Sequence, residues 1–205
     1  MARAAAAIMT TADEIVAAAA ALMWQQGYAS TSVDEIIRES NVCKGSFYHH
    51  FGSKEALGLA VIDAWAGRLA AQVQAKIPPG AAGLEAVATV LDAIVEIQRD
   101  NDYRGCLLGR MALEMADLSE AFRERIEASF NGLRAFLGGF LRQAGMAPGD
   151  AGEQADYLLA TLEGALLFTK VARDGAVLER AVEKMKVELR RQLVETTALQ
   201  AEVEV

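Results

Sequence analysis

Residues 30–57 constrain the fold more than any other segment, because their residue types describe two short helices joined by a tight turn. Either Thr31 or Ser32 can cap the start of the first helix, and Glu35 follows Ser32 at the three-residue spacing of a capping box. Asn41 then favours a turn over a helix interior. The segment therefore predicts a helix, a turn and a second helix, followed by the start of a third.

The second helix, expected from about Cys43 to His50, has two distinct faces. Phe47 and Phe51 are four residues apart, so they share one face and can pack inward. The side chains left to face outward are Lys44, Ser46, Tyr48 and His49. Such a corner can place its second helix in the DNA major groove, although an ordinary surface hairpin of helices has the same pattern.

A family resemblance favours the first interpretation. The run from Val42 to Leu57, VCKGSFYHHFGSKEAL, resembles the signature of the TetR family of transcriptional repressors, and the upstream pairs Gly27-Tyr28 and Thr31-Ser32 also match its pattern. The resemblance implies an all-α homodimer with about nine helices in each chain. It also implies a pseudo-palindromic, double-stranded operator DNA as the partner.

The same resemblance implies two domains. A helix-turn-helix DNA-binding domain is expected in residues 1–53 and continues into a connecting helix at 54–76. Residues 77–205 are expected to sense a ligand or redox signal and to form the dimer.

Residues expected to contact DNA follow from the family pattern, position by position. The Tyr48 hydroxyl and the Lys54 ammonium would bind phosphate and position the duplex, whereas Ser46 and His49 would approach base edges. Gly45 would permit close approach of the backbone. The full set of matching positions is Thr31, Ser32, Lys44, Gly45, Ser46, Tyr48, His49 and Lys54.

Charge gives no support to a generally basic nucleic-acid binder. The formal net charge is −8, and the first 55 residues hold four Lys or Arg against six Asp or Glu. Any affinity for DNA must therefore come from the local placement of a few donors, from helix N-termini and from two copies of the motif in a homodimer.

Helical signals continue along the rest of the chain, which has only three prolines. A flexible arm is expected at residues 1–9 and a frayed end at the C-terminal tail, Ala-Glu-Val-Glu-Val. Apart from the two helices of the opening segment, helices are expected at about 11–26, 53–76, 84–98, 105–116, 119–143, 150–173 and 176–194.

The last two long helices carry small and apolar residues over wide faces. These residues fit the core of the domain, and the family resemblance implies that they also build a four-helix dimer interface; both can hold on different faces. The residues assigned to the interface are Leu158, Leu162, Ala165, Leu166, Leu178, Val182 and Met185.

Two cysteines without a secretion signal indicate a reduced, cytoplasmic chain. Cys43, at the start of the second short helix, is either a simple replacement for serine or a second oxidisable thiol. Cys106 fits either a buried small hydrophobe, which the local pattern favours, or a thiol at a helix start that is partly ionised by Arg104 and Arg110.

A closer resemblance bears on Cys106. Gly105-Cys106-Leu107, the run at 114–120 and the segment around Lys170 resemble the electrophile-sensing branch of the TetR family typified by the N-ethylmaleimide reductase repressor. That resemblance implies that Cys106 and Lys170 form a redox-sensitive pair. Modification of Cys106 by an electrophile or oxidant would then release the repressor from its operator.

A reversible, non-covalent small hydrophobic ligand is the alternative inducer. Aromatic and methionine residues could line its pocket, although at helical spacing such residues more often fill a core. The residues assigned to this pocket are Trp65, Tyr103, Met111, Met115, Phe122 and Phe168.

The residues that catalysis, metal binding or cofactor binding would require are not evident in the sequence. The only histidines, His49 and His50, lie inside the DNA signature, and no oxyanion-hole motif accompanies Cys106, so no catalytic residues are assigned. No metal-ligand spacing or phosphate-binding glycine loop indicates a metal or cofactor, and we expect no membrane-spanning segment.

Overall fold

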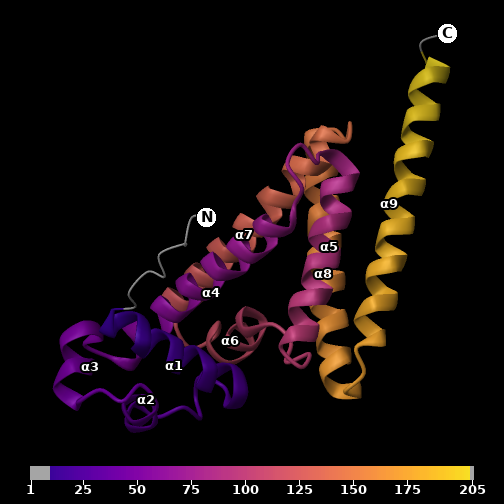
Figure 1. Cartoon of the computed structure of the whole chain (residues 1–205). Coiled ribbons are helices and arrows are strands. Elements are labelled where there is room, and N and C mark those ends of the chain that lie inside the picture. The colour runs from indigo at the N-terminus through magenta and orange to yellow at the C-terminus, as the bar shows by residue number, and fades with distance from the viewer. Residues whose placement is uncertain (1–9, 204–205) are drawn as a thin grey trace, which may run out of the picture. The chain divides into compact units, whose positions relative to one another are not determined.

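The computed structural model describes residues 10–203, and it describes side-chain surroundings for residues 10–193. Over these residues the fold is all-α, as predicted, with nine helices in the order shown in Figure 1. They are α1 (Thr11–Gln26), α2 (Val33–Glu39), α3 (Lys44–Phe51), α4 (Lys54–Lys76), α5 (Gly83–Asp100), α6 (Leu107–Met115), α7 (Glu120–Gln143), α8 (Pro148–Ala172) and α9 (Ala176–Val203).

Helix boundaries agree with the sequence signals to within about two residues, except at the end of α9. This helix continues to Val203 instead of ending near Val194, because residues 176–203 contain no glycine or proline to stop it. The expected flexible arm, residues 1–9, and the last two residues of the expected frayed tail lie outside the described residues.

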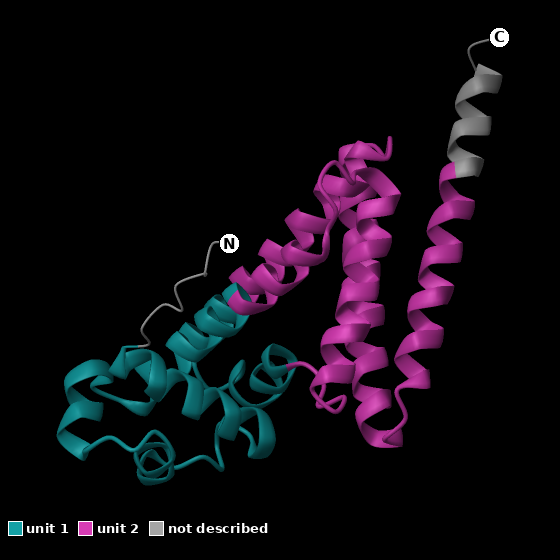
Figure 2. Ribbon diagram, in the orientation of Figure 1, with its two compact units in different colours: residues 1–67, 107–126 teal, residues 68–106, 127–205 magenta. Residues whose placement is uncertain are grey.

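Contacts divide the chain into two compact units (Figure 2). Unit 1 comprises residues 1–67 and 107–126, and unit 2 comprises residues 68–106 and 127–205. The sequence assigned residues 107–126 to the sensing domain, whereas α6 and the start of α7 pack with the N-terminal helices. The helix that immediately follows Cys106 therefore belongs to the unit that carries the helix-turn-helix.

Unit 1 is built on α1, which packs against both α2 and α6, while α2 packs against α3. The unit also includes the first part of α4 and the start of α7. Its fully buried apolar side chains include Ile15, Met23, Ile36, Phe47, Leu57, Ile62, Leu107, Leu108, Met111 and Phe122. Gly27 ends α1 at a φ of +95°, where a Cβ would collide with the Glu114 carboxylate, so this end of α1 requires glycine.

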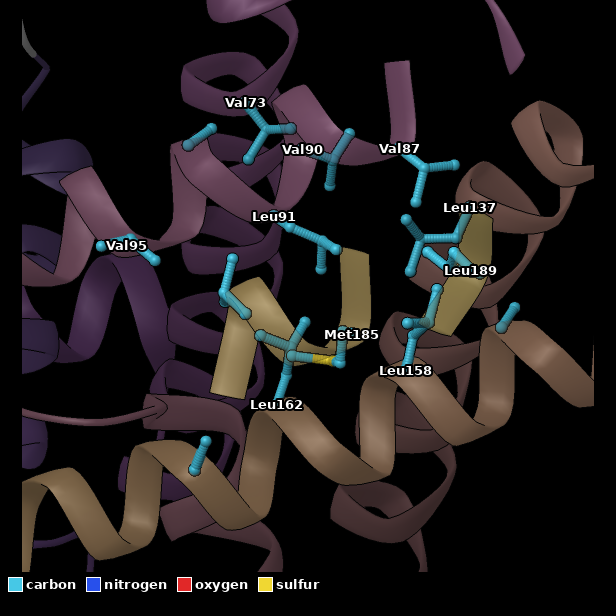
Figure 3. Packing of buried hydrophobic residues seen from close by; sticks show 14 of the residues in the cluster. Val73, Val87, Val90, Leu91, Val95, Leu137, Leu158, Leu162, Met185 and Leu189 are labelled. Carbon is cyan, nitrogen blue, oxygen red and sulfur yellow. The ribbon is translucent and has the colours of Figure 1, made fainter. Parts of the chain in front are cut away.

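Unit 2 has its own core, centred on α5, α8 and α9 (Figure 3). Leu91 from α5, Leu158 and Leu162 from α8, and Met185 from α9 converge there and are almost completely buried. An ion pair also links α9 to α5, since Lys186 Nζ lies 2.7 Å from Asp92 Oδ1. The interior of unit 2 is therefore packed by residues of one chain.

Membrane insertion was not expected from the sequence, yet α4 is long and apolar enough to cross a membrane by length and composition alone. No other helix in the described part of the chain meets that criterion. Within this helix Leu57, Val61 and Ile62 are fully buried, and 28% of its most apolar 18-residue stretch lies inside the fold.

Two glycines of α4 make a matched test of the packing in unit 1. A Cβ on Gly58 would lie 2.5 Å from Phe122 Cζ and 2.8 Å from Tyr28 Cε2, whereas nothing lies within 4 Å of one on Gly67. We expect Gly58→Ala to lower the free energy of unfolding by about 1–3 kcal/mol through overpacking. Gly67→Ala should raise it by about 0.5–1 kcal/mol through helix propensity.

Urea unfolding of both variants at one fixed protein concentration measures the difference. Equal effects of the two substitutions would contradict the close packing of α4 against the Tyr28 and Phe122 rings.

Candidate DNA interface and thiol site

Helix α2 begins with the capping box that the sequence predicted. Ser32 Oγ accepts a hydrogen bond from Glu35 N at 3.2 Å, and Glu35 Oε2 accepts one from Ser32 N at 2.8 Å. The Ser32 N–H and the Ser32 hydroxyl both donate to Glu35 Oε2 at 2.8 Å, and these two bonds hold the pKa of Glu35 below its usual value. Asn41 makes the turn to α3 in the left-handed region, at a φ of +53°. Local signals thus fix both the start of α2 and the angle at which α3 leaves it.

Helix α3 is anchored by one side chain and exposes the others. Phe47 is fully buried, and the Tyr48 ring packs edge-on against it while remaining 47% exposed. The residues with solvent access on this helix include those expected to contact DNA, namely Lys44, Gly45, Ser46, Tyr48 and His49, together with His50. Space around Gly45 is open, since the nearest atom to an added Cβ is Cys43 Sγ at 4.0 Å. The exposed surface of α3 is therefore polar and unobstructed.

Lys44 has a weak partner on the same surface. Its Nζ lies 3.7 Å from Asp34 Oδ1 of α2, and both side chains are largely exposed. An exposed ion pair of this kind contributes little to stability, so a phosphate can replace Asp34 as the partner of Lys44 at little cost. Asp34 also places a negative charge beside the surface that DNA would approach.

Thr31 does not lie on this surface, contrary to its assignment as a DNA contact. Its side chain is completely buried, and Oγ1 donates a hydrogen bond to the Gly27 carbonyl at 2.7 Å. This bond closes the connection between α1 and α2 from inside. Ser32, the other residue of the pair, is exposed and remains the one that can meet a phosphate.

Lys54 begins α4 and is held over an aromatic ring. Its Nζ lies 4.4 Å from the centroid of the Tyr28 ring and donates to the Ala29 carbonyl at 3.4 Å. Burial lowers the pKa of Lys54, although the charges of Glu114 and Glu35 oppose that effect. The ammonium group is thus fixed against the end of the α1–α2 connection.

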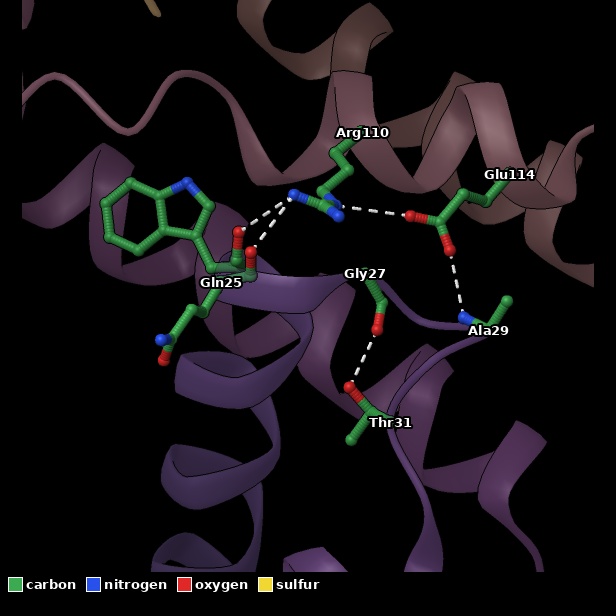
Figure 4. Close-up of polar contacts among 7 residues, drawn as sticks. Gln25, Gly27, Ala29, Thr31, Arg110 and Glu114 are labelled. Carbon is green, nitrogen blue, oxygen red and sulfur yellow. Dashed lines mark hydrogen bonds and ion pairs between the residues drawn. The ribbon is translucent and has the colours of Figure 1, made fainter.

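Helix α6 holds the same connection through two charged side chains, which we call the Arg110–Glu114 clamp (Figure 4). Arg110 Nη1 donates to the carbonyls of Trp24 at 3.4 Å and Gln25 at 3.3 Å, at the end of α1. Glu114 Oε1 accepts from Arg110 Nε at 3.2 Å, and Glu114 Oε2 accepts from Ala29 N at 2.9 Å. The clamp therefore ties α6 to the residues immediately before α2.

The two cysteines have different surroundings. Cys43 is exposed at the N-cap of α3 and makes no capping hydrogen bond with its side chain. Cys106 is partly buried at the end of the loop before α6. The Cys106 thiol donates a hydrogen bond to the carboxylate of Glu163 on α8; burial raises the pKa of that carboxyl group, and the thiol hydrogen bond opposes the rise. Sequence reasoning missed Glu163, because nothing local links it to a residue 57 positions earlier.

Lys170 lies beside the residue that precedes Cys106. Gly105 has a φ of +83°, and a Cβ placed on it would lie 3.5 Å from Lys170 Cδ and 3.9 Å from the Leu166 carbonyl oxygen. Gln98, which is buried, accepts from Gly105 N at 3.1 Å and donates to the Gly105 carbonyl at 3.3 Å. The fold therefore brings the Gly105-Cys106 loop and the Lys170 side chain to the same part of unit 2.

Residues assigned to a ligand pocket are spread over both units. In unit 1, Trp65 packs edge-on against Trp24 with ring centroids 4.4 Å apart, Phe122 packs against Tyr28, Met111 is fully buried and Met115 partly buried. In unit 2, Tyr103 is partly buried near Gly175, whereas Phe168 is 67% exposed.

A cavity of about 660 Å³ in unit 2 is lined by other residues, from the start of α8 and from α9: Met146, Asp150, Glu153, Gln154, Tyr157, Lys184, Glu188 and Gln192. The pocket proposed from the sequence stays a prediction.

The seven residues assigned to a dimer interface are at most 8% exposed and lie in the core of unit 2. They are Leu158, Leu162, Ala165, Leu166, Leu178, Val182 and Met185, and their burial follows from packing between α8, α9 and α5. Other large apolar side chains of the same two helices are exposed, namely Tyr157, Leu167, Phe168, Val171 and Val187. A second subunit would meet this outer set first.

Comparison with known proteins matches both parts of the chain to regulator families. Residues 15–61 match the model for bacterial regulatory proteins of the tetR family. Residues 83–184 match the model for the C-terminal domain of LmrA/YxaF-like transcriptional regulators.

Within the described residues, no group of three or more His, Cys, Asp or Glu side chains could hold a metal ion.

Curated relatives are similar over most of their length. The transcriptional repressor NemR of Escherichia coli K12 is 29% identical over 174 residues, which cover 80% of this chain and 86% of NemR. The regulator LmrA of Bacillus subtilis is 29% identical over 158 residues, covering 75% of this chain and 82% of LmrA. The repressor DhaR of a Mycobacterium species is 29% identical over 166 residues, covering 76% of this chain and 80% of DhaR.

Solved structures agree with these sequence matches. A TetR transcriptional regulator from Legionella pneumophila superposes with a TM-score of 0.81 at 26% identity, covering 89% of this chain and 99% of that one. The reduced form of E. coli NemR superposes with a TM-score of 0.72 at 28% identity, covering 86% and 96%.

Proposed function

Because the chain belongs to the TetR family of DNA-binding transcriptional regulators, we propose that it is a homodimeric repressor released from a pseudo-palindromic operator when an electrophile or oxidant modifies Cys106. It is a regulator and not an enzyme. The single observation that carries the release mechanism is the position of Cys106, which is hydrogen-bonded to Glu163 and is covalently adjacent to the first residue of α6.

Operator binding rests on the exposed surface of α3. Tyr48 and Lys44 bind phosphates and set the register, and Ser46 and His49 face the base edges. Ser32, which is exposed, adds a phosphate contact at the start of α2. With so few donors per chain on an acidic protein, binding depends on two copies held at the spacing of two half-sites.

Dimerisation, which the family implies, uses the outer face of α8. Tyr157, Gly164, Phe168 and Val171 fall on one side of this helix, at spacings of seven, four and three residues. Their large side chains are exposed in the single chain, and nothing lies within 4 Å of a Cβ placed on Gly164. A small residue between large apolar ones lets a second helix approach closely.

Release of the repressor from its operator begins with a reaction at the Cys106 sulfur. The Cys106 thiol adds to an unsaturated carbonyl compound, or an oxidant converts it to a sulfenic acid. In the second case the amine of Lys170 displaces water from the sulfenic acid and forms a sulfur–nitrogen bond. Both products change the volume and hydrogen bonding at the loop that leads into α6.

From Cys106 the change reaches the DNA-binding helices along the chain itself. Leu107 and Leu108 form the first turn of α6 and are fully buried, so an added group on the preceding residue displaces that turn. The Arg110–Glu114 clamp lies on the same helix and holds the end of α1 and the N–H of Ala29. Movement of α6 therefore favours conformers in which α2 and α3 no longer match the operator spacing.

Operator binding is tested with DNA from upstream of the coding region, in a gel-shift assay with a shuffled duplex as competitor. Tyr48→Ala should weaken binding about tenfold or more, because each half-site loses a phosphate hydrogen bond. Lys44→Ala should reduce the slope of log K against log salt by about 0.9 for each lost contact, or roughly 1.8 for the dimer. The control is Lys184→Ala, which removes a positive charge from α9. Equal and weak binding of the wild type to both duplexes would contradict operator recognition.

The dimer interface is tested by sedimentation at several concentrations. Phe168→Glu combined with Leu167→Glu should shift the equilibrium toward monomer, because the new carboxylates lose water on association. Leu113→Glu, at an 87% exposed position on α6, is the control and should leave the dimer unchanged. A double variant that stays fully dimeric at low concentration places the interface elsewhere.

Release is tested by fluorescence anisotropy of operator-bound protein treated with N-ethylmaleimide or hypochlorite. Cys43→Ser, in which Cys106 is the remaining thiol, should dissociate, and the Cys43→Ser/Cys106→Ser double variant should remain bound. Dissociation of the double variant at the rate of Cys43→Ser would remove Cys106 from the mechanism and favour a reversible non-covalent ligand as the inducer.

A further inference from the structure

Glu163 accepts a hydrogen bond from the Cys106 thiol, and no part of the DNA-binding surface uses this carboxylate. It lies on α8 three residues before Leu166 and seven before Lys170, so the three share a flank of the helix. The Leu166 carbonyl and the Lys170 side chain both lie against Gly105. The Gly105-Cys106 loop thus crosses the flank of α8 that carries Glu163 at one end and Lys170 at the other.

The loop is held in this register by its own hydrogen bonds. Gln98 bonds both the N–H and the carbonyl of Gly105, and its backbone carbonyl accepts from Tyr103 N at 2.7 Å. Gly105 adopts a φ of +83°, which disfavours other residues and fixes the direction in which the chain reaches Cys106. These bonds hold the backbone immediately before Cys106 in one conformation.

We propose that Glu163 is the proton acceptor that activates Cys106 toward unsaturated carbonyl electrophiles, an inference that rests on the proposed role of Cys106 as the sensor. A thiol is a poor nucleophile until its proton leaves, and Glu163 is the group hydrogen-bonded to that proton. The Glu163 side chain is partly buried.

Burial favours this role because it makes the carboxylate a stronger base. Loss of water raises the pKa of Glu163, and the hydrogen bond from Cys106 only partly opposes the rise. The proton affinities of the thiolate and the carboxylate are therefore closer than they would be in water, which favours proton transfer during the reaction. Cys43, in contrast, is exposed at the start of α3, and its side chain makes no capping hydrogen bond.

The addition balances without a further reactant. As the Cys106 sulfur bonds to the β-carbon of the electrophile, the thiol proton moves to a Glu163 oxygen and the carbon–carbon π electrons move toward the carbonyl. The protonated Glu163 then returns the proton to the α-carbon. The product is a thioether with a saturated carbon–carbon bond, and Glu163 is again a carboxylate.

The test compares two thiols in one full-length protein. Wild type and Glu163→Gln are treated with excess N-ethylmaleimide, and mass spectrometry of peptides gives the rate of adduct formation at Cys106 and at Cys43. Glutamine keeps the size and hydrogen bonding of the side chain but cannot take the proton. We expect the rate at Cys106 to fall at least about tenfold, in line with the effect of general bases, while the rate at Cys43 stays the same.

Glu163→Asp separates the chemical role from a structural one. It retains a carboxylate, so it should recover part of the lost rate, whereas a side chain needed only for packing would not be rescued by a shorter residue. Operator binding before treatment shows that each variant is folded. If Glu163→Gln does not fold, the comparison is made between wild type and Glu163→Asp, which should react more slowly at Cys106 alone.

Different failures have different meanings. An unchanged or faster rate at Cys106 in Glu163→Gln, with normal release of wild type from DNA, overturns the role of Glu163 and leaves Cys106 as the sensor. Absence of a Cys106 adduct in wild type overturns both proposals together. An adduct at Cys106 that leaves operator binding intact overturns the release mechanism, while the rate comparison still decides the role of Glu163.

Discussion

The Arg110–Glu114 clamp is the interaction on which the functional part of the fold depends. Helices α2 and α3 are seven and eight residues long, too short to be stable alone, so their orientation comes from what holds the α1–α2 connection. Arg110 occupies the carbonyls at the end of α1, and Glu114 occupies the N–H of Ala29. These are charge-assisted hydrogen bonds from partly buried groups, stronger than the exposed pair of Lys44 and Asp34.

The fixed orientation of α2 and α3 explains why an acidic chain can still be a DNA-binding regulator. Long-range attraction is unavailable at a net charge of −8, so affinity depends on placing a few donors correctly. A small rotation of α3 that separates two or three donors from their phosphates then removes much of the binding energy. Dependence on geometry makes such a protein sensitive to a signal that moves one short helix.

Local features of the sequence predicted the helices and the faces of the DNA-binding segment, because their causes are local. The capping box at Ser32 and the four-residue spacing of Phe47 and Phe51 need no knowledge of the rest of the chain. The buried state of Thr31 could not be predicted in this way, because its hydroxyl bonds a carbonyl in the preceding turn and either residue of the Thr-Ser pair can cap a helix.

Contacts between residues far apart in the chain could not be predicted from the sequence for a different reason. Arg110 and Glu114 have the spacing of an ordinary exposed helical pair, and only folding gives them partners more than 80 residues away. The faces of α8 were ambiguous because small and apolar residues surround most of that helix, so periodicity does not separate its core side from its outer side. The residues assigned to the dimer interface from the sequence therefore lie on the core side.

The different settings of the two thiols indicate which one suits a sensor. An adduct on Cys43 would obstruct α3 directly, but an exposed thiol at a helix start reacts with any electrophile that reaches it. Cys106 is partly covered and contacts a carboxylate, so its reaction depends on proton transfer inside the fold. It also precedes two fully buried leucines, where added volume is not tolerated without movement. Selectivity and coupling to DNA binding thus come from the same feature, the packing of the loop that joins α5 to α6.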